Sequence, residues 1–365
     1  MIKTLKKWAV QMLTGANVAT ILLLLLSGYS DRLNPVDHPL LSTTGMTFPF
    51  FLAADMLFLV LWLILKWSRA WLPVAGLLLA YSPIRTYIPL HRASDPPQDA
   101  LKIVSYNVCG YGGNYKYENG FETVMEYLRQ QRPDIICTQE EIDNRNRNTF
   151  QEYGKTWAYN DTLTLSENKK FINVLGIHTR FPIIRRERIP YPTAVNNGSA
   201  AWWLKVGKDT LIVVNNHFES CHLDKNDRAQ YKHILKGELR RDSIPAESQL
   251  ILVKLSEANA LRAPQVRQVC RYVQDHPGYP MVVCGDFNDS PISYSRYAFS
   301  QLLTDCYAET GRGIGLSYNQ KGFFFRIDHI FCSRDIRSYN CKIDNKIDAS
   351  DHYPLVCWVE IGGNP

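Results

Sequence analysis

The first 92 residues carry a much denser hydrophobic pattern than the rest of the chain. One uncharged apolar stretch covers residues 8–29, and a second covers 48–67 with Asp55 and Lys66 as its only charges. A third covers residues 71–84, is shorter and contains two prolines. An apolar helix of about 20 residues, rising about 1.5 Å per residue, crosses a bilayer core of about 30 Å. The pattern therefore predicts a transmembrane region over residues 1–92, with spans at about 8–29, 48–67 and 70–90.

The first apolar stretch has to be weighed against a cleaved signal peptide, because three lysines precede it. Its apolar core is long, and no clean small-x-small cleavage pattern follows it. A second apolar stretch comes next, which favours a retained anchor.

Basic residues near the spans predict the orientation of the chain. Lysines precede the first span, and Lys66 and Arg69 lie between the second and third, which places the N-terminus in the cytoplasm. Three spans then leave the remainder outside the cytoplasm, whereas two leave it inside. Arg85 and Arg92 follow the third stretch and favour the second arrangement. We expect a multi-pass membrane protein whose soluble part is extracytoplasmic, or cytoplasmic if only two spans form.

After residue 93 the composition becomes that of a soluble domain. Residues 93–100 include two adjacent prolines and predict a linker, and a domain follows over 101–362. An amphipathic pattern predicts helices at 121–132 and 263–274. The polar segment 224–262 is also expected to be helical and to form an excursion, that is, an insertion between two of the motifs. Short β-rich runs predict strands at 101–106, 135–138, 173–178, 201–206, 210–215, 280–284, 328–332 and 354–360. So many short strands with few helices between them favour packed sheets with helices outside, an α+β architecture.

Cysteine content and charge change this picture little. All nine cysteines follow residue 100, and Cys137, Cys284, Cys332 and Cys357 lie in apolar runs where a free thiol acts as a small hydrophobic group. No pair has zinc-finger spacing, and a disulfide such as Cys332 with Cys341 stays open. The formal net charge of +6 permits an anionic substrate without requiring a nucleic-acid groove.

The segment Gly285-Asp286-Phe287-Asn288-Asp289 is the most informative polar motif. It follows the apolar run 281–284, and glycine allows a sharp turn at the end of that strand. Asp286 and Asn288 then present hard oxygen atoms, which are the ligands that Mg²⁺ prefers. The same residue types also form ordinary turns, so this segment alone leaves both interpretations open.

Polar residues of the same kind end several other predicted strands. Each of them alone is typical of a cap or a turn, but their recurrence predicts a site assembled at one edge of the sheets. They are Asn107, Glu140, His217 and Asp328, together with the Asp351-His352 pair near the C-terminus.

These motifs, in order Y-N-V, T-Q-E, N-H-F, G-D-F-N-D, R-I-D-H-I and S-D-H-Y-P-L, resemble those of the endonuclease/exonuclease/phosphatase superfamily. That superfamily includes DNase I-like nucleases, apurinic endonucleases, inositol-polyphosphate 5-phosphatases and neutral sphingomyelinases. The segment 176–183 is similar to its G-I-x-S-R-x-P-I motif, with Thr179 in place of serine. The resemblance covers residues 100–362 and implies a four-layer α/β/β/α sandwich of the DNase I type.

The resemblance also implies a role for each motif residue. Glu140 becomes the principal metal ligand, assisted by Asn107, with Asp351 beside the metal. Asp286 and Asn288 orient the nucleophile and contact the phosphate. His352 becomes the catalytic histidine and Asp328 its carboxylate partner. His217 matches a second histidine of DNase I-like and sphingomyelinase-like members, and Arg180 joins it and Asn288 as a substrate-binding residue. Apurinic endonucleases have a tyrosine-containing motif at the position of His217, so the chain leans away from abasic-site repair.

The predicted activity is Mg²⁺-dependent hydrolysis of a phosphodiester or phosphomonoester, with Mn²⁺ as the alternative ion, by in-line attack of an activated water. One hypothesis is a membrane-tethered enzyme acting on a lipid headgroup or small molecule. Aromatic residues that either contact the interface or pack in the core are Tyr111, Tyr115, Tyr117, Phe323, Phe324 and Phe325.

A second hypothesis is a membrane-anchored nuclease acting on DNA or RNA. Basic residues that either contact its phosphate backbone or belong to solvated loops are Arg145, Arg147, Lys169, Lys170, Arg185, Arg186 and Arg188. A third hypothesis, an inactive binding scaffold, is disfavoured by the complete set of metal, histidine and aspartate positions. The sequence leaves the oligomeric state open.

Overall fold

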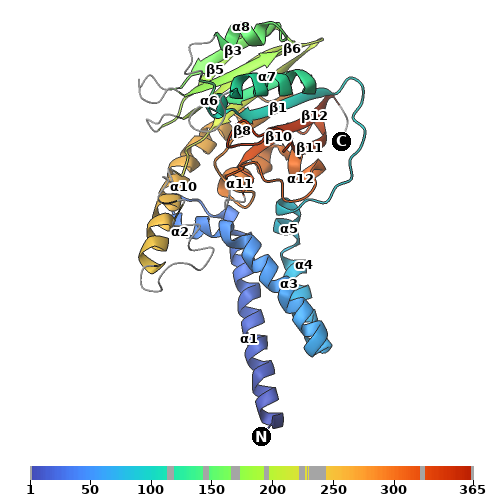
Figure 1. Cartoon of the computed structure of the whole chain (residues 1–365), viewed down its shortest axis with the longest axis vertical. Helices are drawn as coiled ribbons and strands as arrows, with labels where there is room; N and C mark the ends of the chain where they lie inside the picture. Colours follow the sequence, from blue (N-terminus) through green and yellow to red (C-terminus); the bar gives the residue numbers. More distant parts are fainter. Residues whose placement is uncertain are drawn as a thin grey trace.

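The computed structural model describes residues 2–112, 119–142, 148–165, 173–192, 197–221, 227, 229, 244–320 and 325–362. Helices near the N-terminus project as a stalk from a unit that contains all the strands (Figure 1). We call residues 2–87 the helical stalk and residues 101–362 the β-sandwich unit.

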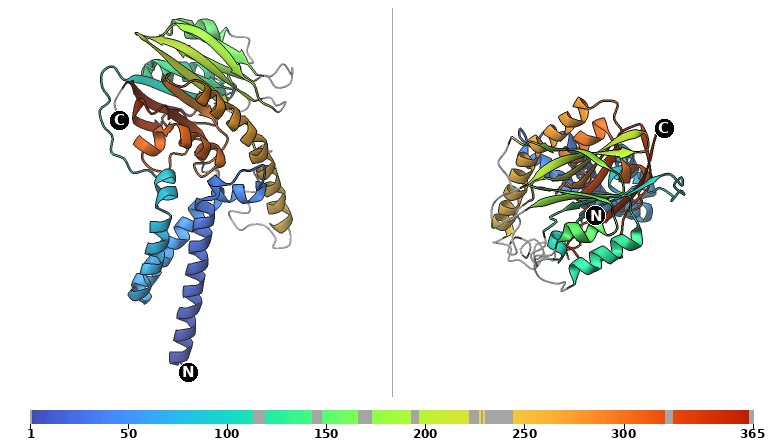
Figure 2. Two further views of the ribbon diagram at one scale, coloured as in Figure 1. Left: turned by 180° about the vertical axis from the view of Figure 1, so that it is seen from behind. Right: turned by 90° about the horizontal axis from the view of Figure 1, so that it is seen from above.

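The helical stalk runs away from the β-sandwich unit and back. It contains α1 (Ile2–Gly28), α3 (Phe48–Leu65), α4 (Trp71–Leu79) and α5 (Tyr81–Tyr87), joined by η1 (Ser30–Arg32), α2 (Pro39–Ser42), η2 (Thr43–Thr47) and η3 (Trp67–Arg69). The N-terminus and η3 lie at the far end, whereas α2, η2 and α5 lie against the β-sandwich unit (Figures 1 and 2).

A buried polar cluster joins two of these helices. The Asn17 amide donates to the Asp55 carboxylate at 3.0 Å, and the Trp62 indole donates to the Asn17 amide oxygen at 3.0 Å. Polar side chains that bond between apolar helices specify how those helices pack. The cluster therefore fixes α1 against α3.

Two helical stretches of the described chain are long and apolar enough to cross a membrane, Thr4–Arg32 and Pro39–Leu65. They contain the first predicted span and residues 48–65 of the second. The third predicted span is divided at Ala80 into α4 and α5, which are too short individually to pass the same test. Proline at position 83 has no backbone N–H to donate and falls where the second helix begins.

Two six-stranded sheets make up the β-sandwich unit. One has the order β11-β12-β1-β2-β4-β3 and the other the order β5-β6-β7-β8-β10-β9. Their strands are β1 (Leu101–Asn107), β2 (Ile135–Gln139), β3 (Tyr159–Thr164), β4 (Val174–Thr179), β5 (Ile183–Ile189), β6 (Gly198–Val206), β7 (Asp209–His217), β8 (Met281–Asp286), β9 (Thr304–Asp305), β10 (Asp328–Cys332), β11 (Ile336–Ile343) and β12 (Leu355–Ile361).

The remaining described helices are α6 (Cys109–Gly112), α7 (Gly120–Gln131), α8 (Thr149–Gly154), α10 (Ile244–Asp275), α11 (Tyr294–Leu302) and α12 (Cys306–Thr310). One hydrophobic core lies between the sheets. A second packs α7 against the first sheet, and a third packs α10 and α11 against the second. The predicted α/β/β/α sandwich is confirmed.

All eight predicted strands are present. The predicted helix 121–132 matches α7 except for its last residue, and the predicted helix 263–274 lies within α10. The prediction missed β3, β5, β9 and β11, which are the four strands at the ends of the two sheets. Within the predicted excursion, residues 244–262 belong to α10. All nine cysteines are free thiols, and the four expected to be buried are buried.

The helical stalk packs directly on the β-sandwich unit. Ile292 is buried in a small core with stalk residues, among them Phe48 and Tyr87. The Arg326 guanidinium donates to the Thr86 carbonyl of α5 at 2.8 Å. The predicted linker is also tied down, because Ser94 exchanges two hydrogen bonds with the Asn340 side chain.

Gly45 in η2 makes this contact close. A Cβ atom at Gly45 would lie 2.1 Å from the Ile292 backbone carbonyl oxygen, whereas one at Gly15 of α1 would meet open space. Gly45→Ala must separate the stalk from the loop that follows β8. We expect it to lower the thermal unfolding midpoint of the full-length protein in detergent and to reduce the phosphate-ester hydrolysis that the sequence predicts.

Gly15→Ala is the matched control. It should leave both properties near the parent values or raise stability by up to about 1 kcal/mol, because alanine favours helix over glycine. Equal behaviour of the two variants would contradict the close contact.

Candidate active site

Parallel strand pairs bring four of the predicted residues to one edge. β1 pairs in parallel with β2, and β7 pairs in parallel with β8. Asn107 and His217 end β1 and β7, Asp286 ends β8, and Glu140 follows β2 directly. Because parallel strands share the direction in which they end, these side chains meet at one side of the sandwich.

Gly285 permits the close approach of β8 to β7. Its φ is +132°, a conformation that residues with a side chain rarely adopt. A Cβ atom there would lie 2.0 Å from the Asn216 backbone carbonyl oxygen on β7. Glycine at this position is therefore required for Asp286 to sit next to His217.

Asn107 connects the two sheets at the site. Its amide nitrogen donates to Glu140 Oε1 at 3.1 Å and to Asp286 Oδ2 at 3.0 Å. Its amide oxygen accepts from the Cys109 backbone N–H at 3.0 Å, so the orientation of the amide is fixed. One side chain thereby holds two carboxylates from different sheets close to each other.

His352 and Asp328 form a buried pair. His352 Nδ1 lies 2.8 Å from Asp328 Oδ2, and Nε2 lies 3.6 Å from Asp286 Oδ2. Burial alone would lower the pKa of His352, but Asp328, Asp286 and Asp351 outweigh it and raise that pKa well above its ordinary value. Burial has the opposite effect on a carboxylate and raises the pKa of Asp286.

His217 faces the same carboxylates from β7. Its Nε2 lies 3.7 Å from both Glu140 Oε1 and Asp286 Oδ2. Its Nδ1 lies 2.8 Å from the Asn173 amide nitrogen, which can only donate. The hydrogen of the neutral ring is therefore on Nε2 and points toward the site.

Asn288 and Asp289 belong to the loop that follows β8, and hydrogen bonds and an ion pair fix their positions. Asn288 has a φ of +52°, its backbone N–H donates to Asp286 Oδ1 at 2.8 Å, and its amide donates to the Phe218 carbonyl at 3.0 Å. Asp289 pairs at 3.0 Å with Arg262, a fully buried arginine of α10. α10 thus stabilises the loop that carries Asn288.

The candidate site contains several oxygen donors that suit a hard cation. Asp286, Asp328 and His352 place one ligand atom each within 4.8 Å of one another. Asp328 Oδ1 is buried and has no hydrogen-bond partner in the described structure. The pKa of the Cys109 thiol is raised, first by burial and then by the negative charges of Asp351 and Glu140. Because these charges act at short range, both carboxylates lie near Cys109. The donor set fits a divalent metal ion.

Arg180 is the one predicted site residue that the structure does not bring to the site. β4 is antiparallel to β2, with Thr179 opposite Ile135, so the end of β4 lies at the start of β2. Arg180 pairs there with Asp134 at 2.9 Å. The same antiparallel register brings Asn173, just before β4, to His217.

Sequence reasoning missed Asn173, Ser350 and Arg262. Ser350 donates to the Asn107 backbone carbonyl at 2.7 Å and accepts from the His352 N–H at 3.2 Å. Its place directly before the Asp351-His352 pair was a local signal for Ser350. Asn173 and Arg262 depend on strand direction and on the path of α10, which no motif encodes.

Tyr111 is buried against Phe121 and Tyr153, so of its two predicted roles the structure supports core packing and not an interfacial contact. Phe325 is half-buried. Tyr115, Tyr117, Phe323 and Phe324 lie outside the described residues, as do Arg145, Arg147, Lys169 and Lys170.

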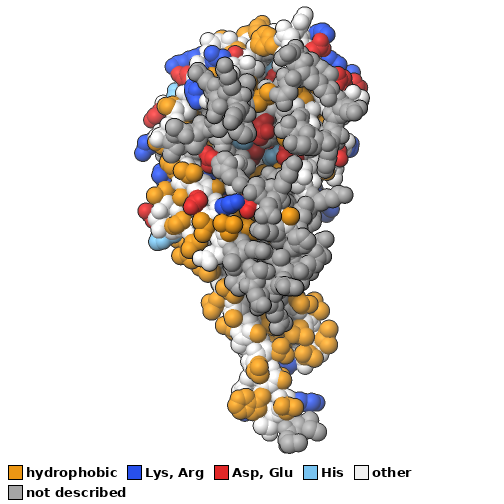
Figure 3. All heavy atoms as spheres, turned by 60° about the vertical axis from the view of Figure 1, so that its left-hand side comes forward, with side chains coloured by type: hydrophobic (Ala, Val, Ile, Leu, Met, Phe, Trp, Pro, Cys, Tyr) orange, Lys and Arg blue, Asp and Glu red, His pale blue; other side chains and the backbone are white. Residues whose placement is uncertain are grey.

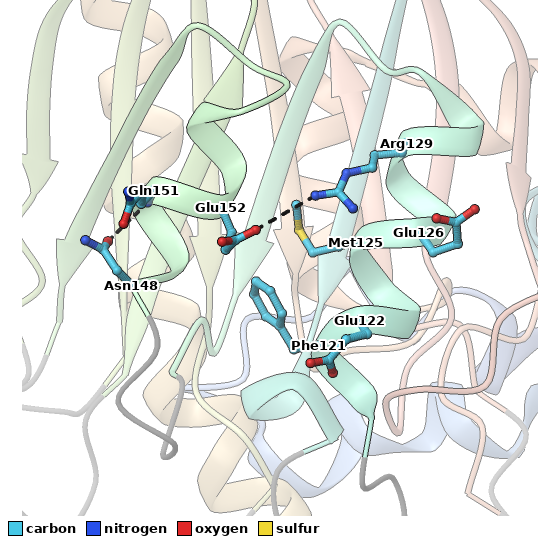
Figure 4. Close-up of a pocket in the computed structure, with 8 residues that line it drawn as sticks. All are labelled: Phe121, Glu122, Met125, Glu126, Arg129, Asn148, Gln151 and Glu152. Carbon is cyan, nitrogen blue, oxygen red and sulfur yellow. Dashed lines mark hydrogen bonds and ion pairs between the residues drawn. The ribbon is translucent and has the colours of Figure 1, made fainter.

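Acidic and histidine side chains gather on the face of the β-sandwich unit shown in Figure 3, while hydrophobic side chains cover the helical stalk below it. A separate cavity of about 620 Å³ lies between α7 and α8 on the outer surface (Figure 4). Glu122, Arg129 and Glu152 line it, together with residues of the same two helices, and none of the predicted site residues does.

Known proteins resemble both parts of the chain. Residues 104–352 match the family described as the Endonuclease/Exonuclease/phosphatase family, and residues 10–87 match a family described as a domain of unknown function. The human Nocturnin catalytic domain with bound sulfate anion is 16% identical, with a TM-score of 0.52, over 74% of this chain and 97% of that one.

Sphingomyelinase C from Streptomyces griseocarneus is 16% identical, with a TM-score of 0.51, over 72% of this chain and 99% of that one. Among curated proteins, the uncharacterized protein F14F9.5 of Caenorhabditis elegans is 23% identical over 196 residues. This match covers 52% of the chain and 54% of the relative, so the chain spans about half the length of that relative. The solved structures share the fold of the β-sandwich unit.

The raised pKa of His352 gives a pH test. Because the folded protein holds this proton more tightly than the unfolded chain, the proton stabilises the fold fully below about pH 6.5. That stabilisation is lost as the pH rises through the raised pKa. In metal-free protein, Asp328→Asn should flatten the fall of the unfolding midpoint above pH 6.5, measured by thermal denaturation in chelator.

Asp161→Asn serves as the control, because Asp161 contacts Arg186 and Trp202 instead of a histidine. It should keep the parent's pH slope. A parent and an Asp328→Asn variant with parallel pH profiles would show that the pair does not hold the His352 proton.

Proposed function

Because the chain belongs to the endonuclease/exonuclease/phosphatase family, whose members are phosphoric ester hydrolases, we propose that it is a metal-dependent hydrolase of phosphate esters tethered to a membrane. The observation that supports this most strongly is the meeting of Glu140, Asp286 and two histidines around Asn107. Carboxylates and imidazoles at such distances bind a cation and move protons.

Glu140 would hold the metal ion, with Asn107 and Asp351 beside it. Its carboxylate is 37% exposed, which leaves it accessible from solvent, whereas Asp286 is almost fully buried. We propose Mg²⁺, with Mn²⁺ as the alternative, because both prefer oxygen ligands. A bound Mg²⁺ would neutralise negative charge on the phosphoryl and leaving oxygens.

Four side chains supply the remaining catalytic and binding roles. Asp286 accepts a hydrogen bond from the attacking water and orients it toward phosphorus. His352, fixed through Nδ1 by Asp328, donates its Nε2 proton to the leaving oxygen, and Asp286 takes the proton that the attacking water gives up. His217 donates its Nε2 hydrogen to a phosphoryl oxygen, and Asn288 contacts the phosphate from the loop after β8. Water attacks in line and no covalent intermediate forms on the enzyme.

A phosphate ester at a bilayer surface, such as a lipid headgroup, is the substrate class we favour. The nuclease alternative requires a free basic surface, yet two of its three described arginines are paired. Arg186 pairs with Asp161 at 2.9 Å, and Arg185 pairs with Glu187. Neutralised arginines attract a phosphate backbone less strongly.

The contacts of the stalk favour three membrane passes. Gly45 lies in the connection between the first two apolar helices and against Ile292 of the β-sandwich unit. That connection and the β-sandwich unit would therefore lie on the same side of a bilayer. α4 and α5 must then return the chain to that side, over roughly 25 Å at helical rise. Lys66 and Arg69 are at the opposite end, which the positive-inside rule places in the cytoplasm. Arg85, which argued against this orientation, pairs with Glu309 at 3.2 Å.

Activity of the full-length protein tests the proposed chemistry. His352→Gln should lower kcat by roughly 100- to 10,000-fold, the range for loss of a proton-transfer group. Glu140→Gln should lower the rate at a fixed Mg²⁺ concentration, because it removes the charge of the proposed metal ligand. Chelator should abolish activity and Mg²⁺ restore it. Substrates should include sphingomyelin and phosphoinositide vesicles, an aryl phosphodiester and plasmid DNA, assayed by released phosphate, headgroup or nicked circles.

Arg180→Gln is the control, because Arg180 lies at the opposite end of β4 and should not affect turnover. Full activity in both the Glu140 and His352 variants would refute the proposed mechanism. Cleavage of plasmid DNA without cleavage of any lipid would replace the lipid substrate by the nuclease alternative.

Cysteine labelling tests the three passes. Asp37→Cys, Ser68→Cys and Lys208→Cys place thiols at exposed positions between the first two spans, in η3, and in the turn between β6 and β7. In intact cells an impermeant maleimide should label the first and third above the parent background, and Ser68→Cys only after permeabilisation. Labelling of Lys208→Cys only after permeabilisation would contradict the extracytoplasmic placement.

A further inference from the structure

Two adjacent glutamates follow β2 and have opposite environments. The Glu140 carboxylate is 37% exposed at the active site, whereas that of Glu141 is 1% exposed inside the protein. The chain turns between them because Glu140 has a left-handed φ of +53°. The active-site chemistry described above makes no use of the buried one.

Glu141 is bound on one oxygen by two side chains. Thr138 Oγ1 donates to Glu141 Oε2 at 2.5 Å, and His178 Nε2 lies 2.9 Å from the same atom. Gly176 makes room for this contact, because a Cβ atom there would lie 1.9 Å from Glu141 Oε2. The carboxylate therefore occupies a cradle built by β2 and β4.

His178 is fixed on every side. Its Nδ1 lies 2.8 Å from Asn160 Oδ1, and the Asn160 amide nitrogen donates to the Trp157 carbonyl at 2.7 Å. The Asn160 oxygen is thus the atom that faces His178, and Nδ1 must donate to it. The Tyr153 ring stacks on the imidazole, with centroids 3.4 Å apart and planes 6° apart.

Backbone hydrogen bonds connect the fixed Glu141 to the conformation of Glu140. The Glu141 N–H donates to the Val174 carbonyl at 3.1 Å, and the Glu140 carbonyl accepts from Gly110 at 2.9 Å and from Ile142 at 2.8 Å. A left-handed residue with a side chain persists only where its surroundings impose it. Glu141 supplies an anchor on the residue directly after that strained position.

We propose that the Glu141–His178 pair is a positioning device for Glu140, which holds the Glu140 carboxylate where a divalent cation binds. The pair acts through the backbone turn and touches neither metal nor substrate. The proposal rests on the proposed function of Glu140 as the principal metal ligand. Partners that orient a metal ligand typically change metal affinity by about 10- to 100-fold when they are removed.

Mn²⁺ binding without substrate tests the proposal. The full-length protein in detergent is titrated with Mn²⁺, and free Mn²⁺ is measured by electron paramagnetic resonance. Glu141→Gln keeps the shape of the side chain but removes its charge, and His178→Gln removes the imidazole. We expect each to weaken Mn²⁺ binding by at least about tenfold, and the double variant to add little because the two residues act as a unit. In activity assays, the Mg²⁺ concentration for half-maximal rate should rise more than kcat falls.

Arg180→Gln is the matched control, because Arg180 lies two residues beyond His178 and also pairs with a carboxylate, that of Asp134. It should change the unfolding midpoint at most, not Mn²⁺ affinity. Parent-like Mn²⁺ affinity in folded Glu141→Gln and His178→Gln, with loss of binding in Glu140→Gln, overturns the positioning role alone. Parent-like affinity in Glu140→Gln overturns the proposed metal role and this inference with it.

Discussion

One buried amide, that of Asn107, joins the two sheets at the point where the site is assembled. It ends a strand of the first sheet and donates to Asp286 of the second as well as to Glu140. The residues of the site depend on this hydrogen bond, because each sheet alone carries only half of them. Ser350 and the Cys109 N–H fix the backbone and the side chain of Asn107 in turn.

Several carboxylates crowd this junction, and their mutual repulsion would destabilise the fold if nothing offset it. Histidines at positions 217 and 352 face Asp286 from either side. Farther out, Arg262 pairs with Asp289 in the interior, so the loop after β8 is held by an ion pair that solvent does not screen. Carboxylates therefore gather at the proposed cation site, and the described histidines and Arg262 offset part of their charge.

Most of the site was predictable because its signals are local. An apolar run that ends in Asn, Glu, His or Asp is visible without knowledge of the fold, and Asn107, Glu140, His217 and Asp286 were found in this way. Strand direction is not local, which is why Arg180 was assigned to the site and Asn173 was missed. The strand β5 was missed because its Ile-Ile-Arg-Arg-Glu-Arg-Ile sequence lies at an edge and alternates poorly.

The contact between the helical stalk and the loop after β8 has a thermodynamic consequence. Ile292 is six residues beyond Asp286, and Arg326 is two residues before Asp328, so both contacts adjoin the site. The stalk acts on the β-sandwich unit as a permanently bound ligand acts on its receptor, stabilising the conformation that it contacts. Cutting the chain between the two would therefore be equivalent to removing that ligand, and the hydrolase fragment would relax toward whichever loop conformations it prefers alone.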